Sequence, residues 1–138
     1  MEKWVEIYKG VIPPGRYTTE ARCGEKEGVV IFLESKENSV KLDFGALSAI
    51  RILDEGVVLQ EIFNKSEFER YDENEFSNTI YKLDEGDFGK FIKKLSGETV
   101  YDFLEYGHYL IITLNYYIEV VSRWEPDIEV ISLVKWNM

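Results

Sequence analysis

The fold class is decided by residues 79–97, TIYKLDEGDFGKFIKKLSG, where a short strand pattern is followed directly by a helix pattern. Residues 79–83 are rich in apolar side chains and predict a short strand. The apolar residues that follow are spaced i, i+3, i+4 and i+7, as Phe88, Phe91, Ile92 and Leu95. This spacing places them on one face of a helix. The stretch therefore predicts a helix over about 87–96 that packs on a sheet.

Both ends of this helix carry end signals. Asp84 or Asp87 is expected to cap the N-terminus, where a side-chain oxygen can accept hydrogen bonds from free backbone N–H groups. Lys93 and Lys94 suit the negative C-terminal end of the helix dipole. Gly97 is a typical residue just beyond a helix end.

Strand patterns precede the helix. The region 40–44 alternates apolar and polar residues, which indicates a half-buried strand, and 29–33 is entirely apolar, as in a central strand. Gly45 interrupts the alternation before a further apolar stretch at 46–53, and a bulge or bend there is the simplest interpretation. Two further strands are expected at 4–12 and 16–23, separated by Pro13-Pro14-Gly15.

Strand patterns also follow the helix. Residues 109–114 and 117–122 predict either a hairpin that turns at Asn115-Tyr116 or one long bent strand, and 128–134 predicts a last strand. A capping-box pattern at Ser66-Glu67-Phe68-Glu69 indicates a short second helix at about 66–72. The whole pattern predicts an α+β fold, with an antiparallel-rich sheet of about seven strands, in one domain covering 1–138.

The charge of the chain is strongly negative and unevenly distributed. The net charge is −10, and residues 54–87 alone carry eleven acidic and three basic side chains, a net charge of −8. Nucleic acids and anionic membranes would repel such a chain, so neither is an expected partner. No window reaches the roughly 18 apolar residues of a membrane span, and the N-terminus lacks a secretory pattern. We therefore expect a cytoplasmic protein.

An acidic surface in this region is a candidate for binding a basic partner protein, although a plainly solvated connection is the alternative. Its expected residues are Asp54, Glu55, Glu67, Glu69, Asp72, Glu73, Glu75, Asp84 and Glu85. Aromatic side chains near it are candidates for specific contacts, because tyrosine and tryptophan supply contact area at low entropic cost. These are Tyr71, Tyr116, Tyr117 and Trp124.

Residues with catalytic or metal-binding chemistry are few. Cys23 is the only cysteine and His108 the only histidine, so no zinc site and no Cys–His pair is expected, and both residues are interpreted as structural. Asp84-Glu85-Gly86-Asp87 lacks the ligand spacing of a calcium loop. Glycine-rich phosphate loops and nucleophile elbows are absent. The chain is therefore predicted to be no enzyme, with no cofactor and no metal.

Three stretches together resemble a known group of proteins. They are residues 44–56, 80–91 and 108–115, followed by Glu125-Pro126. This pattern, within 29–131, is similar to small acidic, largely uncharacterised proteins of Bacillus-like bacteria, of the kind found among immunity proteins for polymorphic toxins. In such sequences an acidic or small residue often follows the hairpin Asn, whereas Tyr116 does so here. The resemblance implies a non-enzymatic cytoplasmic binder and transfers no catalytic residue.

Three functional hypotheses follow. The first is a non-enzymatic protein-binding domain, such as an immunity-type inhibitor that binds a basic protein through the acidic surface. The alternative is a small-molecule-binding or enzymatic domain with a pocket between sheet and helix, near His108 and Tyr101 or Tyr109. The third is a subunit that self-associates through an exposed strand edge.

Overall fold

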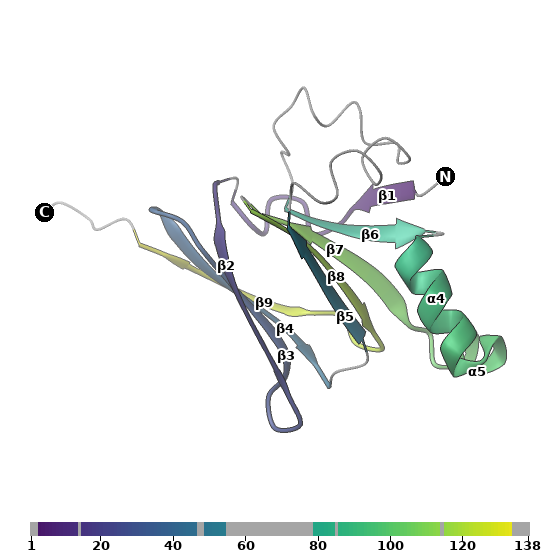
Figure 1. Ribbon diagram of the computed structural model, residues 1–138. Coiled ribbons are helices and arrows are strands. Elements are labelled where there is room, and N and C mark those ends of the chain that lie inside the picture. Colours follow the sequence, from purple (N-terminus) through teal and green to yellow (C-terminus); the bar gives the residue numbers. More distant parts are fainter. Residues whose placement is uncertain are drawn as a thin grey trace, which may run out of the picture.

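The computed structural model describes residues 3–13, 15–46, 49–54, 79–84, 86–113 and 115–133. In these residues the chain is α+β, with nine strands in two antiparallel sheets and two helices (Figure 1). The expected single sheet of about seven strands is thus corrected to two sheets. The predicted short helix at 66–72 lies outside the described residues.

The first sheet has four strands in the order β2-β3-β4-β9. Their bounds are β2 Thr18–Gly24, β3 Gly28–Glu34, β4 Asn38–Gly45 and β9 Asp127–Ser132. β4 alternates buried and half-buried residues along its whole length, as its sequence pattern predicts. β3 is buried along most of its length, which fits its central position and its continuous apolar sequence.

The second sheet has five strands in the order β1-β6-β7-β8-β5. Their bounds are β1 Lys3–Glu6, β5 Ala49–Asp54, β6 Ile80–Asp84, β7 Gly107–Ile112 and β8 Tyr116–Ser122. β7 and β8 pair in an antiparallel hairpin, so the predicted turn near Asn115 is confirmed and the single bent strand is wrong. The backbone N–H of Thr113 donates to the carbonyl oxygen of Tyr116 at 3.0 Å.

The main core lies between the two sheets. It joins Leu33, Leu42 and Phe44 of the first sheet to Ile111 and Ile118 of the second, and all five side chains are fully buried. The opposite face of the five-stranded sheet carries a second apolar cluster. This cluster consists of Trp4, Tyr81, Leu83, Leu110 and Tyr117. Successive apolar residues along the strands of the second sheet therefore face the main core and the second cluster in turn. Such strands are stable only where both faces of the sheet are covered.

Gly45 marks the place where the chain leaves one sheet for the other. Val29 pairs with Gly45 whereas Val30 pairs with Asp43, so Phe44 is the extra residue of a bulge. Gly45 has φ +76°, which favours glycine. The bulge predicted at Gly45 is confirmed, but the stretch that follows it belongs to the other sheet rather than continuing the same strand.

The N-terminal strand is shorter than expected. The sequence pattern predicts a strand over 4–12, but β1 ends at Glu6. Tyr8 adopts φ 52° and Gly10 φ 78°, and the backbone N–H of Val11 donates to the carbonyl oxygen of Tyr8 at 3.0 Å. This turn ends the pairing well before the two prolines, so local backbone conformation overrides the apolar alternation.

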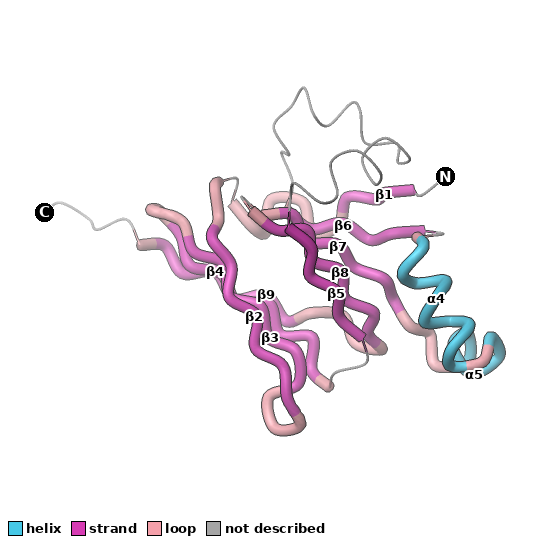
Figure 2. Tube along the Cα trace, viewed as in Figure 1, coloured by secondary structure: helices cyan, strands magenta, loops and turns pink. Residues whose placement is uncertain are grey.

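Two helices lie at one end of the five-stranded sheet (Figure 2). They are α4, Asp87–Ser96, and α5, Glu98–Phe103. The helix predicted at 87–96 is confirmed, with Lys93 and Lys94 in its last turn and Gly97 at its C-terminal boundary. No element was expected at α5.

Two details of the α4 prediction are wrong. The N-cap residue is Gly86, without any side-chain capping bond, rather than Asp84 or Asp87. Phe88 is buried and Ile92 half-buried, but 55% of Phe91 and 68% of Leu95 are exposed. The sheet therefore covers only part of the apolar face, near the first turn of the helix.

Tyr109 of β7 gives the fold a predictable alkaline limit. Burial, with smaller contributions from Tyr8 and Glu125, raises the pKa of its phenol to about 12, compared with 10.0 ordinarily. Since the folded-state pKa is raised, the stabilisation is complete below about pH 10 and is lost as pH rises through 12, a total of roughly 3 kcal/mol. Urea unfolding of the wild type at about pH 8 and about pH 11 should show about half of this loss, roughly 1.4 kcal/mol, because pH 11 lies midway between the two pKa values.

The Tyr109→Phe variant isolates this contribution. It lacks the phenol, so its stability should fall less between the two pH values than that of the wild type. Parallel losses in the two proteins would contradict the assignment to Tyr109.

Candidate functional site

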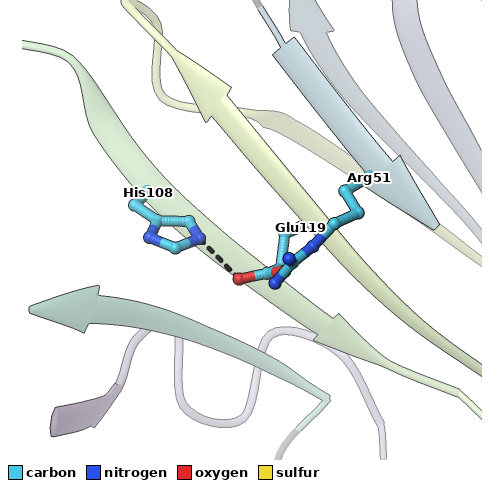
Figure 3. A network of polar contacts seen from close by, with 3 residues as sticks. All are labelled: Arg51, His108 and Glu119. Atoms are coloured by element: carbon cyan, nitrogen blue, oxygen red, sulfur yellow. Dashed lines mark hydrogen bonds and ion pairs between the residues drawn. The ribbon is translucent and has the colours of Figure 1, made fainter. Parts of the chain in front are cut away.

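The candidate site is built on a row of three polar side chains that crosses the outer face of the five-stranded sheet. Arg51 of β5 pairs directly with Glu119 of β8, and His108 of β7 lies diagonally across from Glu119 (Figure 3). Strand alternation places all three on the face opposite the main core. Glu119 is fully buried and His108 is only 4% exposed.

Glu119 has a partner on each carboxylate oxygen. Oε1 lies 2.8 Å from Nε2 of His108, and Oε2 accepts a hydrogen bond of 2.6 Å from Nε of Arg51. The Nη2 group of Arg51 also contacts Oε2. A buried carboxylate is costly unless it is paired and hydrogen-bonded, and this arrangement supplies both.

This network also determines how His108 is protonated in its neutral form. Because a carboxylate only accepts hydrogen bonds, Nε2 of His108 must carry the proton that is donated to Glu119. Nδ1 then presents a lone pair. Nδ1 is buried and finds no hydrogen-bond partner among the residues that the structure describes. His108 therefore retains one unused polar atom.

Helix α4 covers this row at its first turn. The guanidinium carbon of Arg51 lies 4.9 Å from the ring centroid of Phe88, and the Phe88 ring meets the His108 ring edge-on, with centroids 6.0 Å apart. Cation–π and edge-to-face contacts of this kind each stabilise a structure by about 1 kcal/mol. Phe88 thus fixes α4 to the network.

Two glycines allow the helix to approach His108 closely. A Cβ atom on Gly86 would lie 2.6 Å from Cε1 of His108, and one on Gly89 would lie 2.7 Å from Nδ1. Real Cβ contacts are essentially never this short. The first turn of α4 therefore needs glycine at both positions because the imidazole ring packs against its backbone.

Gly89→Ala should destabilise the protein by about 1–3 kcal/mol, since the new methyl group overlaps the fixed His108 ring. Helix propensity alone predicts the opposite, a gain of about 1 kcal/mol for alanine over glycine. In a His108→Ala background the overlap is removed, and Gly89→Ala should become neutral or stabilising. Urea unfolding of the four proteins measures both effects. Stabilisation by Gly89→Ala in the wild-type background would show that the ring does not constrain the helix.

A cavity of about 480 Å³ opens beside this contact, between β6, α4, α5 and the start of β7. His108, Gly86 and Gly89 form part of its wall. The polar and aromatic residues of the remaining wall are Lys82, Asp84, Lys90, Lys93, Tyr101 and Tyr106. Tyr101 and Tyr106 stack on each other, with ring centroids 5.3 Å apart and an interplanar angle of 24°.

Two groups at the cavity have shifted pKa values. The hydrogen bond from Nζ of Lys93 to Oδ1 of Asp102, 3.0 Å long, raises the pKa of the lysine. Burial raises the pKa of the Tyr101 phenol. Both side chains therefore keep their protons at neutral pH, and both can act as hydrogen-bond donors.

The predicted pocket residues are only partly brought together. His108 and Tyr101 both line the cavity. Tyr109 does not, because its side chain points to the opposite face of β7 and packs on Phe44, with ring centroids 5.3 Å apart. Successive residues of a strand face opposite sides, so His108 and Tyr109 cannot share one wall.

The described members of the predicted acidic surface do not lie together. Asp54 is at the Tyr116 end of the five-stranded sheet, and Asp84 is at the Gly107 end, beside the cavity. Both are exposed. The other predicted residues of this surface, with one aromatic, lie outside the described part of the chain. They are Glu55, Glu67, Glu69, Tyr71, Asp72, Glu73, Glu75 and Glu85.

The remaining predicted aromatic residues have different environments. Tyr116 is 40% exposed and Trp124 is 51% exposed, but Tyr116 is the first residue of β8 and Trp124 follows its other end. Tyr117 is 1% exposed and packs on Trp4, so its assignment to a binding surface is wrong. Trp124 borders a second cavity of about 400 Å³ with Asp43 and Glu125. Cys23 is exposed on β2.

Arg51 and Glu119 were not among the site residues predicted from the sequence. Each interrupts an apolar strand pattern with a single charge, Arg51 within 49–53 and Glu119 within 116–122. Charged side chains are almost never fully buried unless they are paired. One acidic and one basic residue, each within a separate apolar strand, were therefore the sequence feature that could have indicated a buried ion pair. The residues near each of them do not indicate that the two strands are neighbours in the sheet.

Comparison with protein-family models, curated proteins and solved structures finds no match to this chain. Within the described residues, neither helix combines the length and apolar character needed to cross a membrane. The same part of the chain contains no group of three or more His, Cys, Asp or Glu side chains placed to hold a metal ion.

Proposed function

We propose that this chain is a non-enzymatic binding domain whose small-molecule ligand occupies the cavity between β6–β7 and the two helices. The observation that carries the proposal is His108, a buried side chain in the cavity wall with one ring nitrogen unpartnered. A cavity of about 480 Å³ lies within the size range of small-molecule sites. Buried polar atoms normally find a partner, and one without a partner favours a functional explanation.

Binding is favoured over catalysis by the surroundings of His108. The carboxylate that orients the ring is shared with Arg51, which offsets its charge. Among the described residues, Nδ1, the atom that would act as a general base, faces the backbone of the first turn of α4 and not a nucleophilic or acidic side chain. A general base must lie within hydrogen-bond reach of the proton it removes. We therefore assign His108 a positioning role, with its ring supporting the cavity wall.

A fragment screen monitored by backbone and His108 ring NMR signals tests this proposal. Fragments that bind should shift the signals of His108, Gly86 and Gly89 together. Lys90→Trp should abolish these shifts by filling the cavity, whereas Lys94→Trp should preserve them, because Lys94 is exposed on the same helix and does not line the cavity. Recovery of each fragment chemically unchanged would support binding without turnover. Failure of any fragment to shift these signals selectively would overturn the proposal.

A second candidate is a protein-binding domain for a basic partner, as the resemblance to immunity proteins implies. The observation that favours it is the cross-strand pairing of Asp54 with Tyr116, because both residues were predicted contacts and both are exposed. Asp54 ends β5, which is an edge strand of the sheet in the described part of the chain, and Tyr116 begins the neighbouring β8. A carboxylate beside an exposed tyrosine suits a basic partner.

Association with the product of the adjacent gene, measured over a range of salt concentrations, tests this candidate. Asp54→Lys should weaken the complex and reduce its salt dependence. Glu129→Lys, on the exposed face of the other sheet, makes the same charge change elsewhere and should have a smaller effect. Equal effects of the two variants would remove Asp54 from the interface.

A further inference from the structure

We propose that the ligand of this cavity is a phosphate monoester attached to a flat ring, an inference that rests on the proposed function. The charges of the cavity wall are its first support. Among the residues that the structure describes, Lys82, Lys90 and Lys93 line the cavity, whereas Asp84 is the one acidic lining residue. This part of the wall is therefore locally positive in a chain whose net charge is −10. A concave positive site within a negative surface selects anions and raises their local concentration.

One of these lysines, Lys90, is directly available to a ligand, because it forms no ion pair with another described residue. The ammonium of Lys82 is not, because Lys82 pairs across the strands with Tyr109 and its Nζ lies 5.8 Å from that ring centroid, on the sheet face opposite His108. Lys93 already pairs with Asp102, but 35% of the Lys93 side chain and 65% of Asp102 are exposed. An exposed pair of this kind contributes little to stability and can exchange its partner for a ligand anion.

The N-terminus of α4 supplies neutral donors to the same cavity. No side chain caps this ten-residue helix, and Gly86 and Gly89 of its first turn both line the wall. The first backbone N–H groups of a helix have no partner within the helix and carry partial positive charge, which suits a phosphate group. The glycines leave this backbone uncovered by side chains, so an anion can approach it.

His108 is the independent observation that points to a ligand here. It is 4% exposed, it lines the cavity, and its Nδ1 has no partner among the described residues. Gly86 and Gly89, the two glycines of the wall, contact its ring. The helix N-terminus and the unused imidazole nitrogen thus belong to one wall.

The stacked tyrosines argue that the phosphate is attached to a flat ring. Tyr101 and Tyr106 form a parallel aromatic pair at the cavity, and an additional ring can pack against such a pair. The phenol of Tyr101 remains neutral at physiological pH and can donate a hydrogen bond to an anion. Phenyl phosphate combines the two features and is the appropriate probe.

Calorimetric and NMR titrations with phenyl phosphate, inorganic phosphate, benzoate and benzyl alcohol test the inference. Phenyl phosphate should bind at least about tenfold more tightly than benzyl alcohol or benzoate at low salt, shift the His108, Gly86 and Gly89 signals, and weaken as salt increases. Lys90→Gln should weaken binding about three- to tenfold, and Lys90→Gln with Lys93→Gln should weaken it more. Lys94→Gln, the matched control on the same helix, should change affinity by less than about twofold.

The outcomes separate the inference from the function on which it rests. If benzyl alcohol or another neutral fragment shifts the cavity signals while phenyl phosphate binds no more tightly, the cavity binds ligands but the phosphate assignment is wrong. Tighter binding of benzoate than of phenyl phosphate would also overturn it. Equal weakening by Lys90→Gln and Lys94→Gln would indicate general surface attraction and overturn it as well. If no probe or fragment shifts these signals, both proposals fail.

Discussion

Arg51→Met should lower the free energy of unfolding by about 3–5 kcal/mol, because it leaves the carboxylate of Glu119 buried without its cationic partner. Glu119 is fully buried, and both its hydrogen bond to Nε of Arg51 and its contact with Nη2 would be lost. Among the described residues, His108 would remain as its only partner. Urea unfolding followed by circular dichroism measures the difference.

Arg22→Met is the matched control. Arg22 also pairs with a glutamate, Glu20, at 3.1 Å, and its guanidinium carbon also lies over a phenylalanine ring, 5.0 Å from the Phe32 centroid. The arginine and glutamate side chains of that pair are 52% and 62% exposed. Removing Arg22 should therefore cost less than about 1 kcal/mol. The two variants thus differ chiefly in the burial of the carboxylate.

Adding Glu119→Gln to Arg51→Met should recover part of the loss. Glutamine retains an oxygen that accepts the His108 Nε2 proton and removes the buried negative charge. If the double variant is as unstable as Arg51→Met, or if Arg22→Met costs as much as Arg51→Met, the loss does not arise from an unpaired buried charge.

Gly28→Ala should destabilise the protein by about 3 kcal/mol or more, since it combines an unfavourable backbone conformation with overlap in a tight turn. Gly28 begins β3 with φ +69°, and a Cβ atom there would lie 1.9 Å from the carbonyl oxygen of Gly45. A backbone carbonyl cannot rotate away as a flexible side chain can. The overlap lies beside the bulge where the chain leaves the first sheet, so relief would require the strands to separate.

Gly24→Ala is the matched control for this effect. Gly24 pairs with Gly28 across the same hairpin, and no atom lies within 4 Å of the position of its Cβ. Its substitution should change stability by no more than about 0.5 kcal/mol. Similar losses in the two variants, measured by thermal and urea unfolding, would show that the approach of Gly28 to Gly45 is not the cause.

The elements with strong local patterns could be predicted from the sequence. The helix over 87–96, the alternating strand around 40–44, the bulge at Gly45 and the hairpin near Asn115 all agree with the structure. Each depends on nearby residues: side-chain periodicity, a glycine that accepts positive φ, or an asparagine in a turn. The prediction of a strand over 4–12 was wrong in its second half, because the backbone turns at Tyr8 and Gly10. This cause too is local.

The candidate site was less predictable. His108 was singled out as a wall residue of an alternative pocket, with Tyr101 as a neighbour, and both line the cavity. The capping of α4 was predicted incorrectly, because Gly86 precedes the helix where an aspartate was expected. Packing against the imidazole ring explains that choice, since any side chain on Gly86 would overlap it.

The amino-acid sequence by itself determined the secondary-structure types, the place of the bulge and the excess of negative charge, since each is a property of one short segment or of the whole composition. Only the tertiary structure decided which charges meet. Arg51 and Glu119 are 68 residues apart, and they pair because β5 lies beside β8 in one particular register. A shift of that register by one residue would turn Glu119 toward the opposite face of the sheet. The register of β5 against β8 is selected because both faces of the five-stranded sheet are covered. The elements that cover them come together only in the complete fold.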